Sequence, residues 1–314
     1  MSTETSKIKL PRTLLEASRY FADPDIANEF VASLRWPDGP ECPTCGGKAL
    51  GYTKTRRLWQ CKDKACKRQF SVKVGSIFED SAIPLDKWIV SVWMIANAKN
   101  GISSHELGRS VGLTQKSAWF VLHRIRLAMQ RGDFRKFSGE VEVDETFVGG
   151  KARNMHPGTR ARKITGTGGK DKTAVMGIIE REGEVRAMVV PDTRKRTLQP
   201  RIMEHVEPGS TVYSDAHSSY TGLESTYDHA TVDHAVEYVR GQVHTNTMEN
   251  FWSLLKRGLA GTYVSVEPFH LFRYLDEQVF RFNTRKANDF TRFAWVLGTV
   301  AKRRLTYAEL TGKA

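Results

Sequence analysis

The sequence has no long hydrophobic run. None of its apolar stretches approaches the roughly 20 residues that cross a bilayer. Its first ten residues, MSTETSKIKL, lack the apolar core typical of a signal peptide. We therefore expect a protein without a membrane partner that stays in the cytoplasm where it is made.

Cysteine is also scarce, with 4 in 314 residues, too few for a disulfide scaffold. All of them lie between residues 42 and 66, as the close pairs Cys42-x2-Cys45 and Cys61-x4-Cys66. Two such turns facing each other supply four thiolates to a tetrahedral zinc ion. Free buried cysteines are the alternative, but they do not predict this pairing. A closed set of four thiolates leaves no open position, so the spacing predicts structural zinc, not catalytic zinc or a redox site.

Acidic residues are outnumbered, with 35 Asp and Glu against 48 Lys and Arg, for a net charge of +13. Because lysine and arginine release counterions when they neutralise phosphates, this excess predicts a polyanionic partner. Charge alone does not separate DNA from RNA, the ribosome or anionic lipid. With 40% hydrophobic residues, the chain has enough apolar mass for several cores.

The order of motifs predicts a multidomain α/β protein. Its expected parts are a helical lead-in over residues 1–36, a zinc ribbon over 37–75, a helix-turn-helix region over 84–132, a catalytic domain with a mixed sheet over 139–290, and a helical tail over 291–314.

The helix-turn-helix prediction depends on local turn chemistry. Ser103 and Glu106 have capping-box spacing, Gly112 marks a turn, and Thr114 is a candidate N-cap for a second helix. The exposed start of that helix offers candidate base contacts at Gln115, Lys116 and Ser117. The alternative is a plain helical hairpin that packs between domains.

Between the first two expected strands, residues 151–172 carry seven Lys and Arg against the single acid Asp171. Such a basic, glycine-rich segment favours contact with a DNA backbone, although a solvated linker is the alternative. The candidate contacts are Lys151, Arg153, Arg162 and Lys163.

Two carboxylates fall in segments that read as buried strands. Asp144 follows Val141 and Val143, and Asp215 follows an apolar stretch. Acids in a sheet core are unfavourable unless a cation lies between them, so a divalent metal is expected. We interpret Glu142 and Glu145 as ordinary solvent-facing neighbours of Asp144 and assign them no role.

A third candidate, Glu249, lies at the start of an amphipathic helix. Lys256 follows seven residues later, two turns along the same face, with Arg257 beside it as a further candidate DNA contact. The alternative is a capping box, in which Asn246 is the N-cap and Glu249 its partner. Asp144, Asp215 and Glu249 together suit two Mg²⁺ or Mn²⁺ ions about 4 Å apart, an arrangement that serves phosphodiester transfer.

The chain resembles bacterial insertion-sequence DDE transposases with an N-terminal zinc ribbon and an ISXO-two-like catalytic domain. The segments that carry the resemblance are RWPDGPECPTCGG, VEVDETFVGGK, YSDAHSSY, HTNTMENFWSLLKRGLAGTY and RYLDEQVFRFNTRK. The resemblance implies an RNase H-like fold with Asp144 and Asp215 as the first two acids. It leaves both Asn246 and Glu249 eligible as the third, and we choose Glu249 because of the seven-residue spacing to Lys256.

The same resemblance implies a reaction on double-stranded DNA. Water first attacks at the element's end to free a 3′-OH, which then attacks target DNA, and the helix-turn-helix selects the terminal inverted repeats. The protein is expected to act in a bacterial cytoplasm, at the nucleoid, as a homo-oligomer on DNA. The alternatives are a DNA-binding regulator that has lost catalysis and an RNase H-like nuclease without strand transfer.

Overall fold

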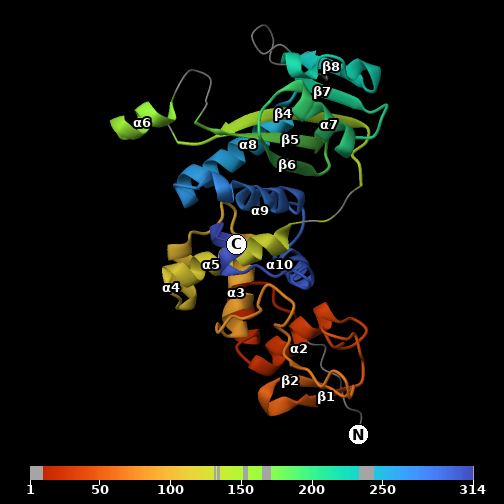
Figure 1. Cartoon of the computed structure of the whole chain (residues 1–314), viewed down its shortest axis with the longest axis vertical. Helices are drawn as coiled ribbons and strands as arrows, with labels where there is room; N and C mark the ends of the chain where they lie inside the picture. Colours follow the sequence, from red (N-terminus) through yellow and green to blue (C-terminus); the bar gives the residue numbers. More distant parts are fainter. Residues whose placement is uncertain are drawn as a thin grey trace. The chain divides into compact units, whose positions relative to one another are not determined.

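The computed structural model describes residues 10–130, 132, 135–150, 155–164, 171–232 and 244–313 (Figure 1). The chain divides into two compact units. Unit 1 combines residues 1–129 with residues 286–314, and unit 2 comprises residues 130–285. No helix in the described ranges is both long and apolar enough to span a membrane.

Unit 1 contains a small antiparallel sheet in the order β1-β2-β3. Its strands are β1 (Leu50–Thr53), β2 (Leu58–Cys61) and β3 (Gln69–Phe70), with the short turn η1 (Lys54–Arg56) between the first two. Aromatic rings in contact with one another make up much of its core. Trp59 lies with its ring centroid 5.3 Å from Trp36, 5.9 Å from Phe70 and 4.9 Å from Tyr52. So few residues bury little apolar surface, and such folds usually need a disulfide or a metal.

Helices form the rest of unit 1. They are α1 (Leu14–Tyr20), α2 (Pro24–Arg35), α3 (Leu85–Asn97), α4 (Ser104–Val111), α5 (Gln115–Met129), α10 (Asp289–Gly298) and α11 (Tyr307–Thr311). The central helix is α3, whose Trp88, Ile89 and Val92 are fully buried. Phe293 of α10 packs on Trp93 of α3 with ring centroids 4.9 Å apart. Helix α10, which follows unit 2 in the sequence, therefore contributes to the core formed by the helices of residues 1–129.

The turn between α4 and α5 forms as its sequence predicts. The Ser103 hydroxyl accepts a hydrogen bond from the Glu106 amide at 3.1 Å, and Gly112 ends α4 in the left-handed region with φ 65°. Thr114 then caps α5, because its Oγ1 accepts from the Ser117 amide at 3.2 Å. Serine and threonine caps of this kind fix where each helix begins.

Unit 2 is built on a mixed sheet in the order β6-β5-β4-β7-β8. Its strands are β4 (Glu140–Val148), β5 (Thr173–Glu180), β6 (Val185–Val190), β7 (Thr211–Asp215) and β8 (Asp228–Val232). Strands β4, β5 and β6 pair antiparallel, whereas β7 runs parallel to both β4 and β8. The mixed α/β sheet expected from the sequence is therefore present.

The other described elements of unit 2 are helical. They are α6 (Pro157–Lys163), α7 (Lys195–His205), η3 (Ser218–Tyr220), η4 (Leu223–Ser225), α8 (Asn246–Gly258), the π-helical turn η5 (Leu259–Tyr263), η6 (Pro268–His270) and α9 (Leu271–Asn283). One core cluster joins α7 to the sheet through residues such as Val143 and Leu198, and a second joins α8 and α9 through Val175 and Phe251. Figure 1 shows α8 and α9 together beside strands β4 to β6.

Alternation along β4 decides which residues meet each layer. Val141 and Val143 belong to the cluster that includes α7. Glu142 and Asp144 point the other way, and both form hydrogen bonds with residues of α8. The central strand therefore presents two acids beneath a helix.

Candidate metal centres and nucleic-acid contacts

The four cysteines come together as the sequence predicts. Their sulfur atoms all lie within 4.8 Å of one another. The Cys42–Cys66 and Cys45–Cys61 sulfur distances are 3.7 and 3.6 Å. A zinc ion with Zn–S bonds of about 2.3 Å places tetrahedral sulfur ligands about 3.8 Å apart, so the arrangement matches the expected geometry.

The electrostatics of this group also favour a cation. Burial opposes ionisation of Cys42, but backbone amides of Cys45 and Thr44 outweigh it and lower its pKa to about 7. For Cys61 the Asp63 amide favours the thiolate, yet burial and the neighbouring sulfurs raise its pKa to about 12. Four thiolates this close repel one another unless a positive ion lies between them.

Asp144 lies on β4, beneath α8. Its Oδ2 accepts a hydrogen bond from Trp252 Nε1 at 2.9 Å, and its Oδ1 accepts from the Glu145 amide at 2.8 Å. Directly across the strand pair stands Gly177 of β5. A Cβ atom there would lie 2.2 Å from Met248 Cε and 2.7 Å from a ring carbon of Trp252, so the absent side chain lets α8 lie against the sheet.

Asp215 ends β7 on the parallel neighbour of β4. The register pairs Glu142 with Tyr213, so Asp144 and Asp215 each follow two residues later on their strands. Asp215 Oδ1 accepts a hydrogen bond from the His217 amide at 3.1 Å. The parallel pairing thus places the two predicted acids at one level of the sheet.

Glu249 lies in the first turn of α8 and is exposed, as is Asn246. The capping-box alternative does not form. The N-cap is Thr245, with no side-chain cap bond, and Asn246 is the first helical residue. Glu249 is therefore not the capping-box partner of Asn246.

The charges of Asp215 and Glu249 act on Asp144. Burial is the largest cause that raises the pKa of Asp144, to about 6, and the negative charges of Asp215 and Glu249 raise it further. The Glu145 amide and the Trp252 indole oppose this by donating to the ionised form. Within the described part of the chain, only the cysteines form a group of three or more potential ligands within 4.8 Å.

The interpretation of Glu142 and Glu145 as solvent-facing neighbours is wrong. Glu142 is fully buried and accepts hydrogen bonds from the Thr247 and Met248 amides, each at 3.0 Å. Glu145 points to the opposite face, where burial raises its pKa to about 8 and the charges of Asp144 and Asp215 add to the effect. A strand at the centre of a sheet usually has one apolar face, whereas β4 carries acids on both faces. This departure from alternation was the only sign in the sequence that Glu142 and Glu145 are not ordinary surface residues.

The candidate DNA contacts lie in several places. Gln115 and Lys116 are exposed at the start of α5, where Gln115 Nε2 also donates to Ser104 Oγ at 2.9 Å. Ser117 is half-buried and accepts from the Thr114 hydroxyl at 2.9 Å. Of the other predicted contacts, Lys256 and Arg257 are exposed on α8 and Arg162 is exposed on α6, which ends at Lys163. Lys151 and Arg153 lie outside the described residues.

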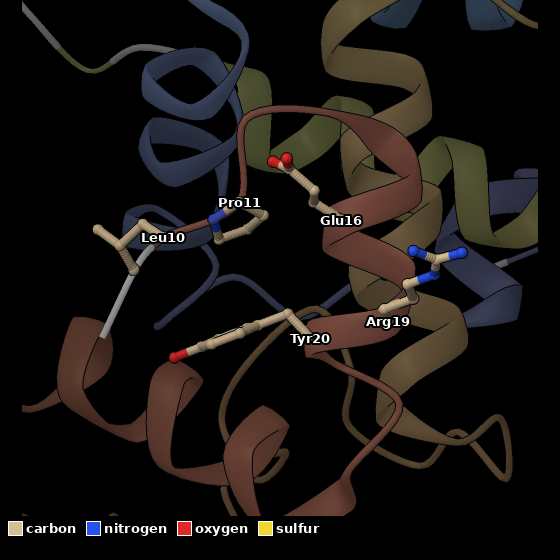
Figure 2. Close-up of a pocket in the computed structure, with 5 residues that line it drawn as sticks. All are labelled: Leu10, Pro11, Glu16, Arg19 and Tyr20. Carbon is tan, nitrogen blue, oxygen red and sulfur yellow. The ribbon is translucent and has the colours of Figure 1, made fainter. Parts of the chain in front are cut away.

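The pocket in Figure 2 lies elsewhere, at the start of α1, and is lined by Leu10, Pro11, Glu16, Arg19 and Tyr20. Its carboxylate belongs to the capping box of α1, where Glu16 accepts from the Thr13 amide. None of the predicted site residues lines it.

Comparison with known proteins identifies the family. The profile of the ISXO2-like transposase domain matches residues 136–283, and that of the transposase zinc-ribbon domain matches residues 23–69. A transposase-like protein of Haemophilus influenzae is 35% identical over 101 residues, which cover 32% of this chain and 81% of the relative. The chain belongs to the ISXO2-like transposase family.

A second relative is similar over a larger share of the chain. It is a protein of the transposable element ISH50 from Halobacterium salinarum, 29% identical over 248 residues, which cover 74% of this chain and 82% of the relative. Within this chain, all four cysteines fall in the zinc-ribbon match and both strand acids fall in the transposase-domain match. The cysteine cluster is thus the structural zinc site of a zinc ribbon.

Proposed function

We propose that this chain is a DNA transposase that cleaves the ends of its insertion sequence and joins the freed 3′-OH to target DNA. The observation that carries the proposal is the parallel register of β4 and β7, which sets Asp144 level with Asp215 within the match to a transposase domain. Support for an RNase H-like fold comes from a central strand with an antiparallel neighbour on one side and a parallel neighbour on the other.

The donor set fits divalent ions that prefer oxygen ligands. Asp144, Asp215 and Glu249 would hold Mg²⁺ or Mn²⁺, and when bound there the ions supply Lewis acidity to the attacking and leaving oxygens of a phosphodiester. Three carboxylates from separate elements are a donor set that can serve two ions about 4 Å apart. Trp252 donates a hydrogen bond to the Asp144 carboxylate and holds it in one orientation.

DNA contacts are proposed on two surfaces, one in each unit. Lys256 and Arg257 are exposed on the helix that bears Glu249 and are suited to phosphates beside the cleaved bond. In unit 1, helices α4 and α5 have the turn chemistry of a helix-turn-helix, with Gln115 and Lys116 exposed for terminal-repeat recognition. Pairing of two element ends is proposed to require a homo-oligomer on DNA.

The test is strand transfer by the full chain on a labelled oligonucleotide that carries the element's end, with Mn²⁺ or Mg²⁺. We expect Asp144→Asn, Asp215→Asn and Glu249→Gln each to lower the rate by at least about 1,000-fold, because each removes an ion-binding charge. Glu207→Gln is the matched control, since Glu207 is an exposed acid of the same unit between α7 and β7. It should react like wild type.

The outcomes separate the alternatives. Loss with Asn246→Ala but full activity with Glu249→Gln would move the third ligand to Asn246. Cleavage without joined products identifies a nuclease. End binding without any chemistry by folded wild-type protein identifies a regulator, and either of these last two results contradicts the proposed function.

A further inference from the structure

A cluster of largely buried side chains includes the two residues that lie two positions before Asp144 on β4 and Asp215 on β7. We define the Glu142 cluster as Glu142, Arg181, Tyr213 and Thr247. Glu142 and Tyr213 are register partners on β4 and β7, and both are buried. Arg181 follows β5, and Thr247 lies in the first turn of α8. The cluster therefore joins every element that carries one of the proposed metal ligands.

Glu142 bonds the start of α8 in place of a side-chain N-cap. Its Oε2 accepts from the amides of Thr247 and Met248, each at 3.0 Å, and its Oε1 accepts from the Thr247 hydroxyl, also at 3.0 Å. The first amides of a helix have no partner within the helix, and the helix dipole favours a negative charge beside them. Here that charge comes from a strand, so the helix start is tied directly to the sheet.

Arg181 balances the buried charge and extends the connection. Its Nε donates to Glu142 Oε1 at 3.0 Å, and Nη2 donates to the carbonyl of His244, just before α8, at 3.0 Å. Its guanidinium carbon lies 4.1 Å from the centre of the Tyr213 ring on β7. A buried carboxylate is stable only when its charge and lone pairs are satisfied in this way.

We infer that Glu142 is a positioning residue that sets the distance between Asp144 and Glu249, and thereby the geometry in which divalent ions bind. This inference rests on the proposed function. Glu142 lies two residues before Asp144 on β4. Its carboxylate also accepts a hydrogen bond from the amide of Met248, the residue before Glu249. Loss of the carboxylate frees the helix start while it leaves all three proposed ligands chemically intact.

The test compares Glu142→Gln with Glu277→Gln in the full-length protein. Glutamine keeps the size of Glu142 but replaces one acceptor oxygen with an NH₂ that cannot accept from Arg181 or the helix amides. Glu277 is the matched control because it lies in unit 2 and is equally buried. Its partners include Arg281 on α9 and Tyr263 on η5, neither of which belongs to the start of α8. Both changes remove one buried, paired charge.

The first readout is the affinity for Mn²⁺ without DNA, measured by titration calorimetry. The second is the rate of amide hydrogen exchange in residues 245–252. We expect Glu142→Gln to weaken Mn²⁺ binding by about 10- to 100-fold, as loss of groups that orient metal ligands usually does. Exchange at Thr247 and Met248 should accelerate. Glu277→Gln should leave both readouts at wild-type values, even where it lowers the melting temperature.

A milder variant covers the case in which Glu142→Gln does not fold. Thr247→Val removes only the hydroxyl bond to Glu142, and we expect a several-fold loss of Mn²⁺ affinity in the same direction. Wild-type affinity in folded Glu142→Gln, or in Thr247→Val if the first variant is unfolded, overturns the inference and leaves the proposed function intact. Wild-type protein that binds no Mn²⁺ contradicts the proposed function itself, and the inference with it.

Discussion

The two candidate metal centres differ in how much of each exists before an ion arrives. In the zinc ribbon, four thiols lie within 4.8 Å of one another, and two close sequence pairs supply them all. In unit 2, the acids come from three separate elements, and the pKa of Asp144 is raised to about 6. A structural metal completes its fold, whereas a catalytic site is held open by the fold around it.

Zinc removal should give the largest effect in this comparison. A structural zinc binds its domain with of order 10 kcal/mol, more than so small a sheet contributes by itself. We expect chelation, or Cys42→Ser, to abolish exchange protection over residues 42–70 and weaken binding to the element's end, while residues 136–283 keep theirs. Hydrogen exchange with mass spectrometry checks this directly. Persistent protection or undiminished end binding after verified zinc loss contradicts it.

A second, smaller effect is expected where α8 meets the sheet. Gly177→Ala places a Cβ 2.2 Å from Met248 Cε and 2.7 Å from the Trp252 ring, so the helix has to shift. Overpacking of this kind costs about 1–3 kcal/mol, and movement of Trp252 releases its bond to Asp144. We expect a lower unfolding midpoint in urea and strongly reduced strand transfer. Gly261→Ala, which meets nothing within 4 Å, is the control and should change neither.

The smallest expected effect concerns pH. Because the folded protein raises the pKa of Asp144 from 3.8 to about 6, its proton is bound more tightly in the folded state. Without divalent ions, this acid therefore lowers stability progressively as pH rises from about 4 to about 6, and its full penalty persists above that. Asp144→Asn removes a penalty of at most about 3 kcal/mol.

Melting temperatures without divalent ions check this prediction. Asp144→Asn should be more stable than wild type at pH 7 and equal to it near pH 4, and added Mn²⁺ should narrow the gap by stabilising wild type more. The control is Glu207→Gln, an exposed acid of the same unit, which should follow wild type throughout. An Asp144→Asn protein no more stable than wild type at pH 7 would contradict the raised pKa.

Sequence reasoning succeeded where the controlling interactions are local. Cysteine spacing placed the zinc ribbon, and Ser103, Gly112 and Thr114 placed the turn between α4 and α5 because caps and glycine act within a few residues. The same reasoning failed at Glu142, whose partner Thr247 lies 105 residues away. No local sequence pattern indicates such a contact, so Glu142, between two buried valines, was interpreted as a solvent-exposed residue.

The roles of Asp144, Asp215 and Glu249 remain predictions, but part of their placement has a physical reason that the sequence could not supply. Parallel register sets Asp144 level with Asp215, and it follows from the order in which strands pair. Gly177 gave no signal on its own, because its role appears only when Trp252 is seen beside it. The short helix α6 within the basic segment 151–172 was also unforeseen.

The division of unit 1 into two stretches of chain has a consequence for biosynthesis. Residues 1–129 leave the ribosome first, yet Phe293, which packs on Trp93, follows only after all of unit 2. A nascent chain therefore finishes the unit that bears the zinc ribbon last. Any product truncated before residue 286 carries the proposed catalytic acids but lacks α10, so translation has to pass α10 before the core of unit 1 can close.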